Sequence, residues 1–182
     1  VLERSGIDAT EHAYRQRHPI TGRLPATFDY PHTHNVFSVA DFTRRWLGLT
    51  GVAMAISTAC SSSAKAFASA WRQMRAGFCD AAVVGGVDSL CLTTLYGFNA
   101  LGLASTQPFR PCDVERDGLN VGEAAGFVLL EWAEPGDDRV LLLGYGESSD
   151  AYHMTAAHPE GAGATLAMQQ ALARAEVLPE QV

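Results

Sequence analysis

The sequence has no apolar run near the roughly 20 residues that cross a bilayer, so no membrane-spanning helix is expected. A secretory signal would need a basic stretch followed by an apolar one, and residues 1–5 provide neither. We therefore expect a cytoplasmic protein. Basic residues are also scarce, with 13 Lys and Arg against 20 Asp and Glu. The resulting net charge of -7 argues against a broad nucleic-acid-binding surface.

Cysteine pairs with metal-binding spacing are absent as well. The chain has four cysteines, Cys60, Cys79, Cys91 and Cys112, and none form a C-x-x-C pair. We expect neither a metal site nor a disulfide framework. Cys79 and Cys91 fit small buried residues beside a strand. The glycine-bearing run at residues 122–126 is not followed by Lys and Ser or Thr, so it does not predict nucleotide binding.

Apolar periodicity predicts helices that alternate with short strands. The predicted strands are residues 52–57, 80–87, 124–132 and 140–146, and the predicted helices are residues 9–17, 34–47, 61–76 and 163–175. The first two strands, with the helix between them, have the length of a right-handed parallel crossover. The last two are expected to form an antiparallel pair across a turn. Together they predict an α/β domain in which helices cover a mixed sheet, with a sizeable core.

Cys60 is the strongest candidate for chemistry. It follows the predicted strand at residues 52–57 and precedes the predicted helix at residues 61–76, so it lies at a helix N-terminus. There the helix dipole and unpaired backbone N–H groups favour a thiolate and can hold an oxyanion. An inert buried cysteine is the alternative. The small Ser, Thr and Ala neighbours permit a tight turn and leave room for a carbonyl, which favours the nucleophile.

Two other polar segments stand out. His153 follows the predicted strand at residues 140–146, where α/β sites gather, but a hydrogen-bonded structural histidine is the favoured interpretation. Residues 110–118 alternate in charge and contain a Pro and a Gly. They indicate an ordered loop that is held together by salt bridges between its own side chains. We expect such a loop to orient a site and not to take part in the chemistry.

Several segments together resemble the β-ketoacyl-acyl-carrier-protein synthases, the condensing enzymes of the thiolase fold. In chain order the matching segments are Ser57-Thr58-Ala59-Cys60-Ser61-Ser62, residues 80–88 with Gly85-Gly86, residues 96–101 with Ser105-Thr106, Arg110-Pro111-Cys112-Asp113, Arg116-Asp117-Gly118, residues 122–126 and residues 150–155. The resemblance begins near residue 33 and implies a layered α-β-α-β-α fold for a whole family member. Residues 1–32 would be an irregular polar excursion, residues 33–139 the N-terminal thiolase-like half, and residues 140–182 the start of the second half.

The resemblance implies a role for each matched residue. Cys60 is the nucleophile that accepts an acyl group from acyl carrier protein, and its backbone N–H is an oxyanion donor. Phe98 matches an aromatic residue that shapes the acyl pocket, and Thr155 matches a contact to the pantetheine arm. The family's ordered loop is matched by Arg110, Asp113, Arg116, Asp117 and Glu123. His153 matches a position that is not a catalytic histidine.

The resemblance also implies decarboxylative condensation with malonyl-acyl carrier protein, without a bound cofactor. Family members are dimers, in which the strand matching residues 80–87 pairs across the two-fold axis. The family's two catalytic histidines and its lysine lie in motifs that residues 1–182 do not contain. We therefore expect a part of a longer protein that cannot complete the condensation by itself.

Two other functions compete with the condensing enzyme. One is a non-catalytic, chain-length-setting partner subunit, but such partners generally lack the nucleophile that Cys60 provides. The other is a cysteine hydrolase, which needs a histidine and an acid from within the chain and would act on simple esters without carrier protein.

Overall fold

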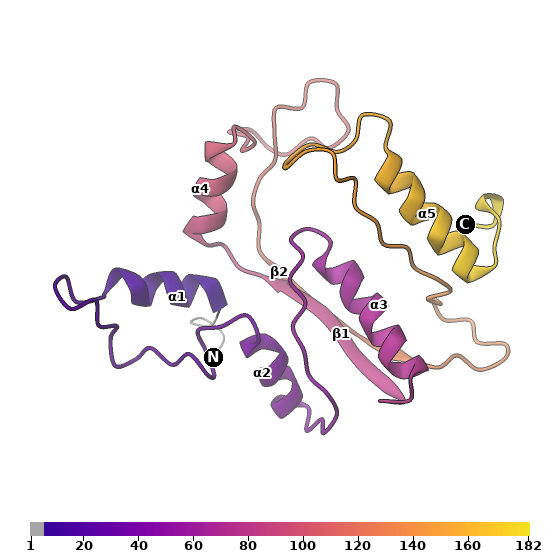
Figure 1. Ribbon diagram of the computed structural model, residues 1–182, viewed down its shortest axis with the longest axis horizontal. Coiled ribbons are helices and arrows are strands. Elements are labelled where there is room, and N and C mark those ends of the chain that lie inside the picture. The colour runs from indigo at the N-terminus through magenta and orange to yellow at the C-terminus, as the bar shows by residue number, and fades with distance from the viewer. Residues whose placement is uncertain (1–5) are drawn as a thin grey trace.

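Residues 6–182 are the part of the chain that the computed structural model describes, and the first five residues of the expected polar excursion lie outside it. The helices are α1 (Gly6–Arg15), α2 (Ser38–Trp46), α3 (Ser62–Arg75), α4 (Leu92–Ala100) and α5 (Ala162–Ala175), followed by the short 3-10 helix η1 (Pro179–Gln181). The strands are β1 (Ala81–Asp88) and β2 (Ala124–Glu131). Figure 1 shows α3 lying along β1 near the middle of the molecule.

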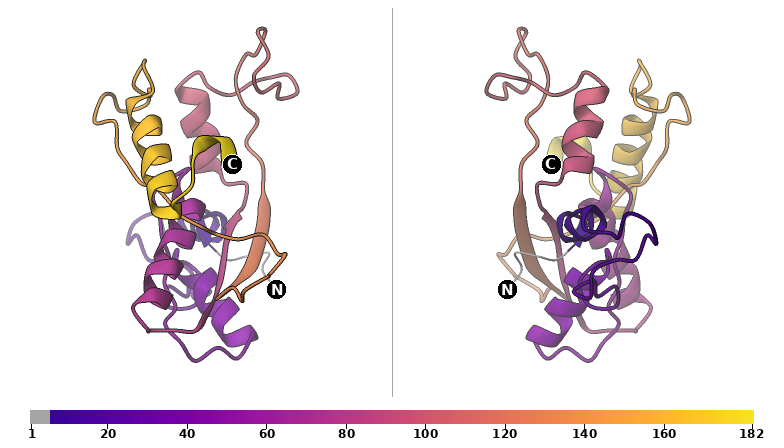
Figure 2. Two further views of the ribbon diagram at one scale, coloured as in Figure 1. Left: turned by 90° about the vertical axis from the view of Figure 1, so that its right-hand side faces the viewer. Right: turned by 90° about the vertical axis from the view of Figure 1, so that its left-hand side faces the viewer.

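The centre of the fold is formed by α3 and the two strands. β1 and β2 pair antiparallel over their full length, with Gly85 opposite Phe127. Ala68 and Met74 of α3 and Val84 of β1 are buried, as expected where a helix packs on a sheet. In Figure 2, α3 lies on one side of this sheet and β2 forms the opposite margin of the molecule.

Residues 140–150, in the segment between β2 and α5, lie between the helices α3 and α5 (Figure 1). They approach α5 so closely that an added Cβ on Gly144 would lie 2.4 Å from the carbonyl oxygen of Ala171. Glycine is therefore the residue that lets this backbone lie against the helix.

The predicted helices are confirmed with small shifts of their ends, whereas two predicted strands are wrong. Residues 52–57 have no strand partner in the described chain, and residues 140–146 form no strand either. β2 pairs with β1 instead of with residues 140–146, so the sheet is a two-stranded antiparallel one and contains no parallel crossover. An apolar run becomes a strand only where another strand can take its hydrogen bonds.

One helix is not predicted from the sequence. α4 lies in the stretch at residues 88–123 that was expected to be loop-rich. Its apolar residues surround the helix rather than forming one stripe, so periodicity gives no signal. Its first turn is capped from α1, where the Glu11 carboxylate accepts hydrogen bonds from the backbone N–H groups of Leu92 (2.8 Å) and Thr93 (2.6 Å).

The expected sizeable core is not formed by the described residues. The chain exposes 13724 Å² of surface, whereas a self-contained monomer of its mass exposes roughly 8,500 Å². The buried residues among those described are Ala9, Ala13, Ser38, Ala68, Met74, Val84, Cys91 and Gly163. The burial predicted for Cys91 is confirmed, and Cys79 is half-buried. No helix within residues 6–182 is both long and apolar enough to cross a membrane.

Candidate functional site

Cys60 lies in a tight turn that leads directly into α3. The turn is tied by hydroxyl groups: Ser62 Oγ accepts a hydrogen bond from the Thr58 backbone N–H (2.8 Å) and donates one to the carbonyl of Ala59 (2.7 Å). Ser61 Oγ also donates to the carbonyl of Thr58 (2.9 Å). The predicted helix after Cys60 is present, while the strand expected before it is replaced by irregular chain and this turn. The junction is therefore held by side-chain hydrogen bonds of small polar residues.

The turn leaves the thiol accessible. Cys60 is exposed, and Ala59 before it adopts a left-handed backbone with φ 53°. A non-glycine residue in this region costs on the order of 1 kcal/mol or more, which surrounding contacts must offset. The five hydroxyl and backbone bonds at residues 58–62 do so here. An exposed thiol before the first turn of a 14-residue helix has the position that a nucleophile requires.

The charged loop at residues 110–118 is bonded to itself. Arg110 donates to the carbonyl of Glu115 (2.8 Å), and Arg116 donates to the carbonyl of Asp113 (2.9 Å). The Asp113 carboxylate accepts the Glu115 backbone N–H (2.7 Å), and the Asp117 carboxylate accepts the Ser105 hydroxyl (2.7 Å). These side chains therefore hold the loop in one shape.

Glu123 connects this loop to the end of β1, since its carboxylate accepts the Leu90 backbone N–H at 3.1 Å. Asn120, which the sequence reasoning did not select, braces the same region. Its side-chain carbonyl accepts the Phe109 N–H (2.8 Å), and its amide donates to the carbonyl of Ser105 (3.3 Å). An isolated Asn in a loop gives no sequence signal for such a role.

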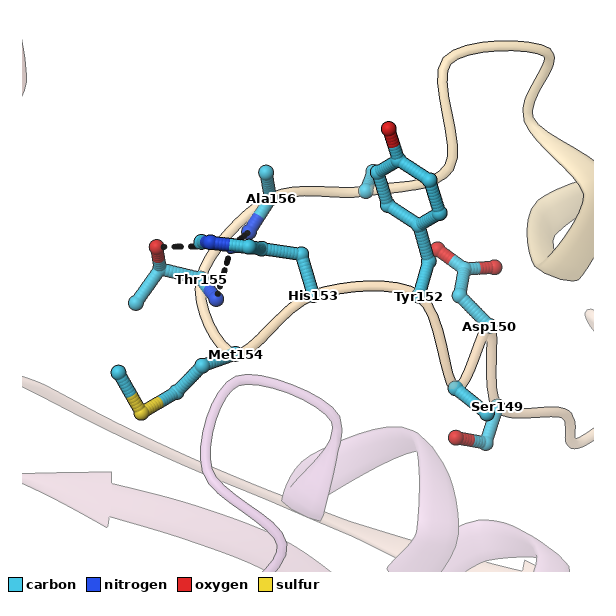
Figure 3. A pocket seen from close by; sticks show the side chains of 9 residues that line it. Ser149, Asp150, Tyr152, His153, Met154, Thr155 and Ala156 are labelled. Atoms are coloured by element: carbon cyan, nitrogen blue, oxygen red, sulfur yellow. Dashed lines mark hydrogen bonds between the residues drawn. The ribbon is translucent and has the colours of Figure 1, made fainter.

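Thr155 lies on an exposed loop formed by residues 149–157, which encloses an open hollow of about 610 Å³. Figure 3 shows the His153 ring turned toward Thr155 and Ala156. His153 Nδ1 accepts the backbone N–H groups of Thr155 (3.1 Å) and Ala156 (3.2 Å). His153 therefore stabilises the shape of the loop through hydrogen bonds, as the prediction of a structural histidine requires.

Phe98 is half-buried on α4, whereas Cys60 lies in the turn before α3, so the two residues belong to different elements of the fold. Among residues 6–182, neither Phe98 nor Thr155 makes a hydrogen bond to Cys60. The described structure also contains no group of three His, Cys, Asp or Glu side chains that could hold a metal ion.

The sequence reasoning also missed a charged link between α3 and residues 145–147. The Glu147 carboxylate forms salt bridges with two side chains of α3, with Lys65 Nζ at 2.7 Å and with Arg72 Nη1 at 2.9 Å. The hydrogen bond from Lys65, with that from Arg72, holds the pKa of Glu147 below its usual value although partial burial acts against this. A pair separated by 82 positions has no spacing signature, so the sequence could not have revealed it.

The chain matches two adjoining family models. The one described as "Beta-ketoacyl synthase, N-terminal domain" matches residues 7–135, and "Beta-ketoacyl synthase, C-terminal domain" matches residues 140–182. A curated relative, 3-oxoacyl-[acyl-carrier-protein] synthase 2 of Rhizobium meliloti, is 41% identical over 142 residues, covering 71% of this chain and 34% of the relative. The chain thus spans about a third of the length of this relative.

Solved structures are similar as well. A ketosynthase in complex with its chain length factor, from Xenorhabdus doucetiae, is 35% identical with a TM-score of 0.77, covering 96% of this chain and 42% of that one. A type II polyketide acyl carrier protein in complex with its ketosynthase, bound to the hexaketide, gives 28% identity and a TM-score of 0.70, covering 80% of this chain and 39% of that one. The predicted thiolase-like α/β class is confirmed by these similarities.

Proposed function

Because the chain belongs to the beta-ketoacyl synthase family, we propose that it forms the acyl-accepting part of a 3-oxoacyl-acyl-carrier-protein synthase. The reaction would serve fatty-acid or polyketide-type biosynthesis. The observation that carries this proposal is the exposed thiol of Cys60 in a hydroxyl-tied turn at the start of α3.

The acyl transfer begins with the Cys60 thiolate. It attacks the thioester carbonyl, and the oxyanion of the tetrahedral intermediate is held by backbone N–H groups at the turn, that of Cys60 included. The carbon–sulfur bond to the pantetheine arm then breaks. The arm leaves as a thiolate, which takes a proton from solvent to become a thiol, and the acyl group remains on Cys60 as a thioester.

In the second half-reaction, loss of CO₂ from malonyl-acyl carrier protein leaves a carbanion that attacks the acyl carbon and releases the Cys60 thiolate. This step needs donors that stabilise an enolate. The family's two catalytic histidines, which would supply them, lie in motifs that are absent from residues 1–182. We therefore assign only acyl loading to the residues of this chain.

The remaining site residues support the transfer. Phe98 would border the acyl chain, and Thr155 would contact the pantetheine arm. The loop formed by Arg110, Asp113, Arg116 and Asp117, with Glu123, would hold the site's frame rather than react. A bound cofactor has no place in this scheme because the arm of the carrier protein delivers the substrate.

Two partners follow from the proposal. The first is an acyl carrier protein, which is bound to the ketosynthase in one of the similar structures. The second is another copy of the chain or a homologous subunit, since a similar ketosynthase is paired with its chain length factor. β1 pairs with β2 along one edge, and no described strand occupies its other edge, which leaves that edge open for pairing across a two-fold axis.

The test is to incubate the purified protein with an acyl-acyl carrier protein and to measure its intact mass. We expect a mass increase of one acyl group, located on Cys60 by peptide mapping. Cys60→Ala should abolish it, whereas Cys112→Ala should retain it, because Cys112 is a matched exposed thiol outside the turn.

An acyl adduct on a residue other than Cys60 would contradict the proposal. Rapid turnover of simple esters without carrier protein would favour the cysteine hydrolase instead.

A further inference from the structure

The Glu147 carboxylate joins two points on α3. Lys65 Nζ lies 2.7 Å from Oε1 and Arg72 Nη1 lies 2.9 Å from Oε2, so each oxygen has its own cation. Lys65 and Arg72 are seven residues apart on the helix, which places them on one face and about 10 Å apart along the axis. Two contacts at this spacing fix both the rotation of α3 and its position along its own axis.

Tyr145 makes further contacts between the same segments. Two guanidinium groups lie over its ring, that of Arg72 at 5.4 Å and that of Arg174 of α5 at 4.5 Å from the ring centroid. Trp71 of α3 meets the ring edge-on at 5.5 Å. In a cation–π contact the guanidinium charge is attracted to the face of the aromatic ring. Residues 145–147 are therefore held by α3 on one side and by α5 on the other.

The link is unusual among the ion pairs of the described residues. Every other ion pair there joins residues at most eight positions apart, so it stabilises only local structure. The pairs of Glu147 instead span 82 and 75 positions. Glu147 is only 28% exposed and has two cationic partners, which makes its bonds stronger than those of an isolated surface pair.

Each end of this link lies close in sequence to a residue of the proposed site. Lys65 lies five residues after Cys60, within the first turns of α3, and Glu147 lies eight residues before Thr155. Rotation or sliding of α3 against residues 145–147 would therefore move the thiol relative to the loop at residues 149–157. Misplacement of a reacting group by about 1 Å can slow a reaction on the order of 100-fold.

We propose that Glu147 is a positioning residue that, through Lys65 and Arg72, holds the Cys60 thiol in register with the loop that contacts the pantetheine arm. This inference rests on the proposed function. It concerns the alignment of a bulky carrier-bound substrate with the thiol, and not the intrinsic reactivity of the thiol.

The test compares two reactions of Cys60 in the purified full-length protein. The first is single-turnover acylation by acyl-acyl carrier protein, followed by mass spectrometry, and the second is alkylation by iodoacetamide, a small reagent that needs no alignment with the loop. Glu147→Gln should slow acylation about tenfold or more and leave alkylation within about twofold. A matched control is Glu131→Gln, because Glu131 bonds Arg139 at the end of the sheet where Ala81 pairs, and it should change neither rate.

A second variant distinguishes a loss of positioning from a folding defect. Lys65→Met should reproduce most of the loss in acylation. The double variant should lose no more than Glu147→Gln alone, because Lys65→Met removes one of the two ion pairs that Glu147→Gln removes. Equal acylation by Glu147→Gln and the unsubstituted protein would overturn the inference. So would parallel losses of acylation, alkylation and melting temperature, which indicate a merely structural role. Failure of the unsubstituted protein to be acylated at Cys60 would overturn the proposed function itself, and this inference with it.

Discussion

Gly146 lies against the backbone of α5 so closely that a Cβ on it would come within 1.7 Å of the carbonyl oxygen of Ala167. A backbone oxygen inside a helix cannot move aside as a side chain can. Residue 146 is therefore restricted to glycine by contact, and the segment that carries Tyr145 and Glu147 is placed by the same contact.

The first prediction is that Gly146→Ala separates residues 144–148 from α5. We expect a loss of about 1–3 kcal/mol in the free energy of unfolding, measured by urea denaturation. Gly51→Ala is the matched control, since a Cβ there meets nothing within 4 Å, and its effect should stay within about 0.5 kcal/mol. Similar values for the two variants would contradict the close approach.

The second prediction separates two neighbouring glycines of β1. A Cβ on Gly85 would lie 2.3 Å from the carbonyl oxygen of Gly126, whereas one on Gly86 would lie 2.7 Å from the Ser63 hydroxyl, which can rotate away. Gly85→Ala should therefore destabilise the protein by about 1–3 kcal/mol and Gly86→Ala by less than about 1 kcal/mol. Adding Ser63→Ala should recover the loss in Gly86→Ala, and no recovery would place the strain elsewhere.

The third prediction concerns the cap that α1 provides for α4. The hydrogen bond from the Thr93 hydroxyl, with the two backbone N–H groups, holds the pKa of Glu11 below its usual value. Glu11→Ala should speed hydrogen exchange at the Leu92 and Thr93 amides, because a helix N-terminus without an acceptor frays. Asp8→Ala, at an exposed acid on the same helix, should leave these rates unchanged.

The fourth prediction is a pH dependence from Glu147. Its pKa in the folded protein lies below the ordinary value of 4.5, so its stabilising effect is complete above about pH 4.5 and is lost as pH falls through the folded value. The difference in unfolding free energy between the unsubstituted protein and Glu147→Gln should therefore be largest near neutral pH and shrink as pH falls below 4.5 through the folded-state pKa. A difference that does not vary with pH would show that the carboxylate charge contributes nothing.

The sequence by itself determined α1, α2, α3 and α5 and the turn at Cys60. The predicted helix at residues 61–76 appears as α3 within one residue at each end, and Gly77 follows it with φ 75°. A helix forms its hydrogen bonds between residues four apart, so its pattern is contained in a short stretch of sequence. The small hydroxyl residues at 58–62 act over the same short range.

The tertiary structure alone decided which strands exist and how the distant segments meet. Residues 52–57 and 140–146 have strand-like sequences but no partner strand in the described chain, and β2 pairs with β1 instead. The cap on α4 comes from Glu11, 81 positions away, and the charged link on α3 comes from Glu147, 82 positions away. These three kinds of contact each need a partner from a distant part of the chain. The spacing of residues along the sequence does not show which distant segment that partner comes from.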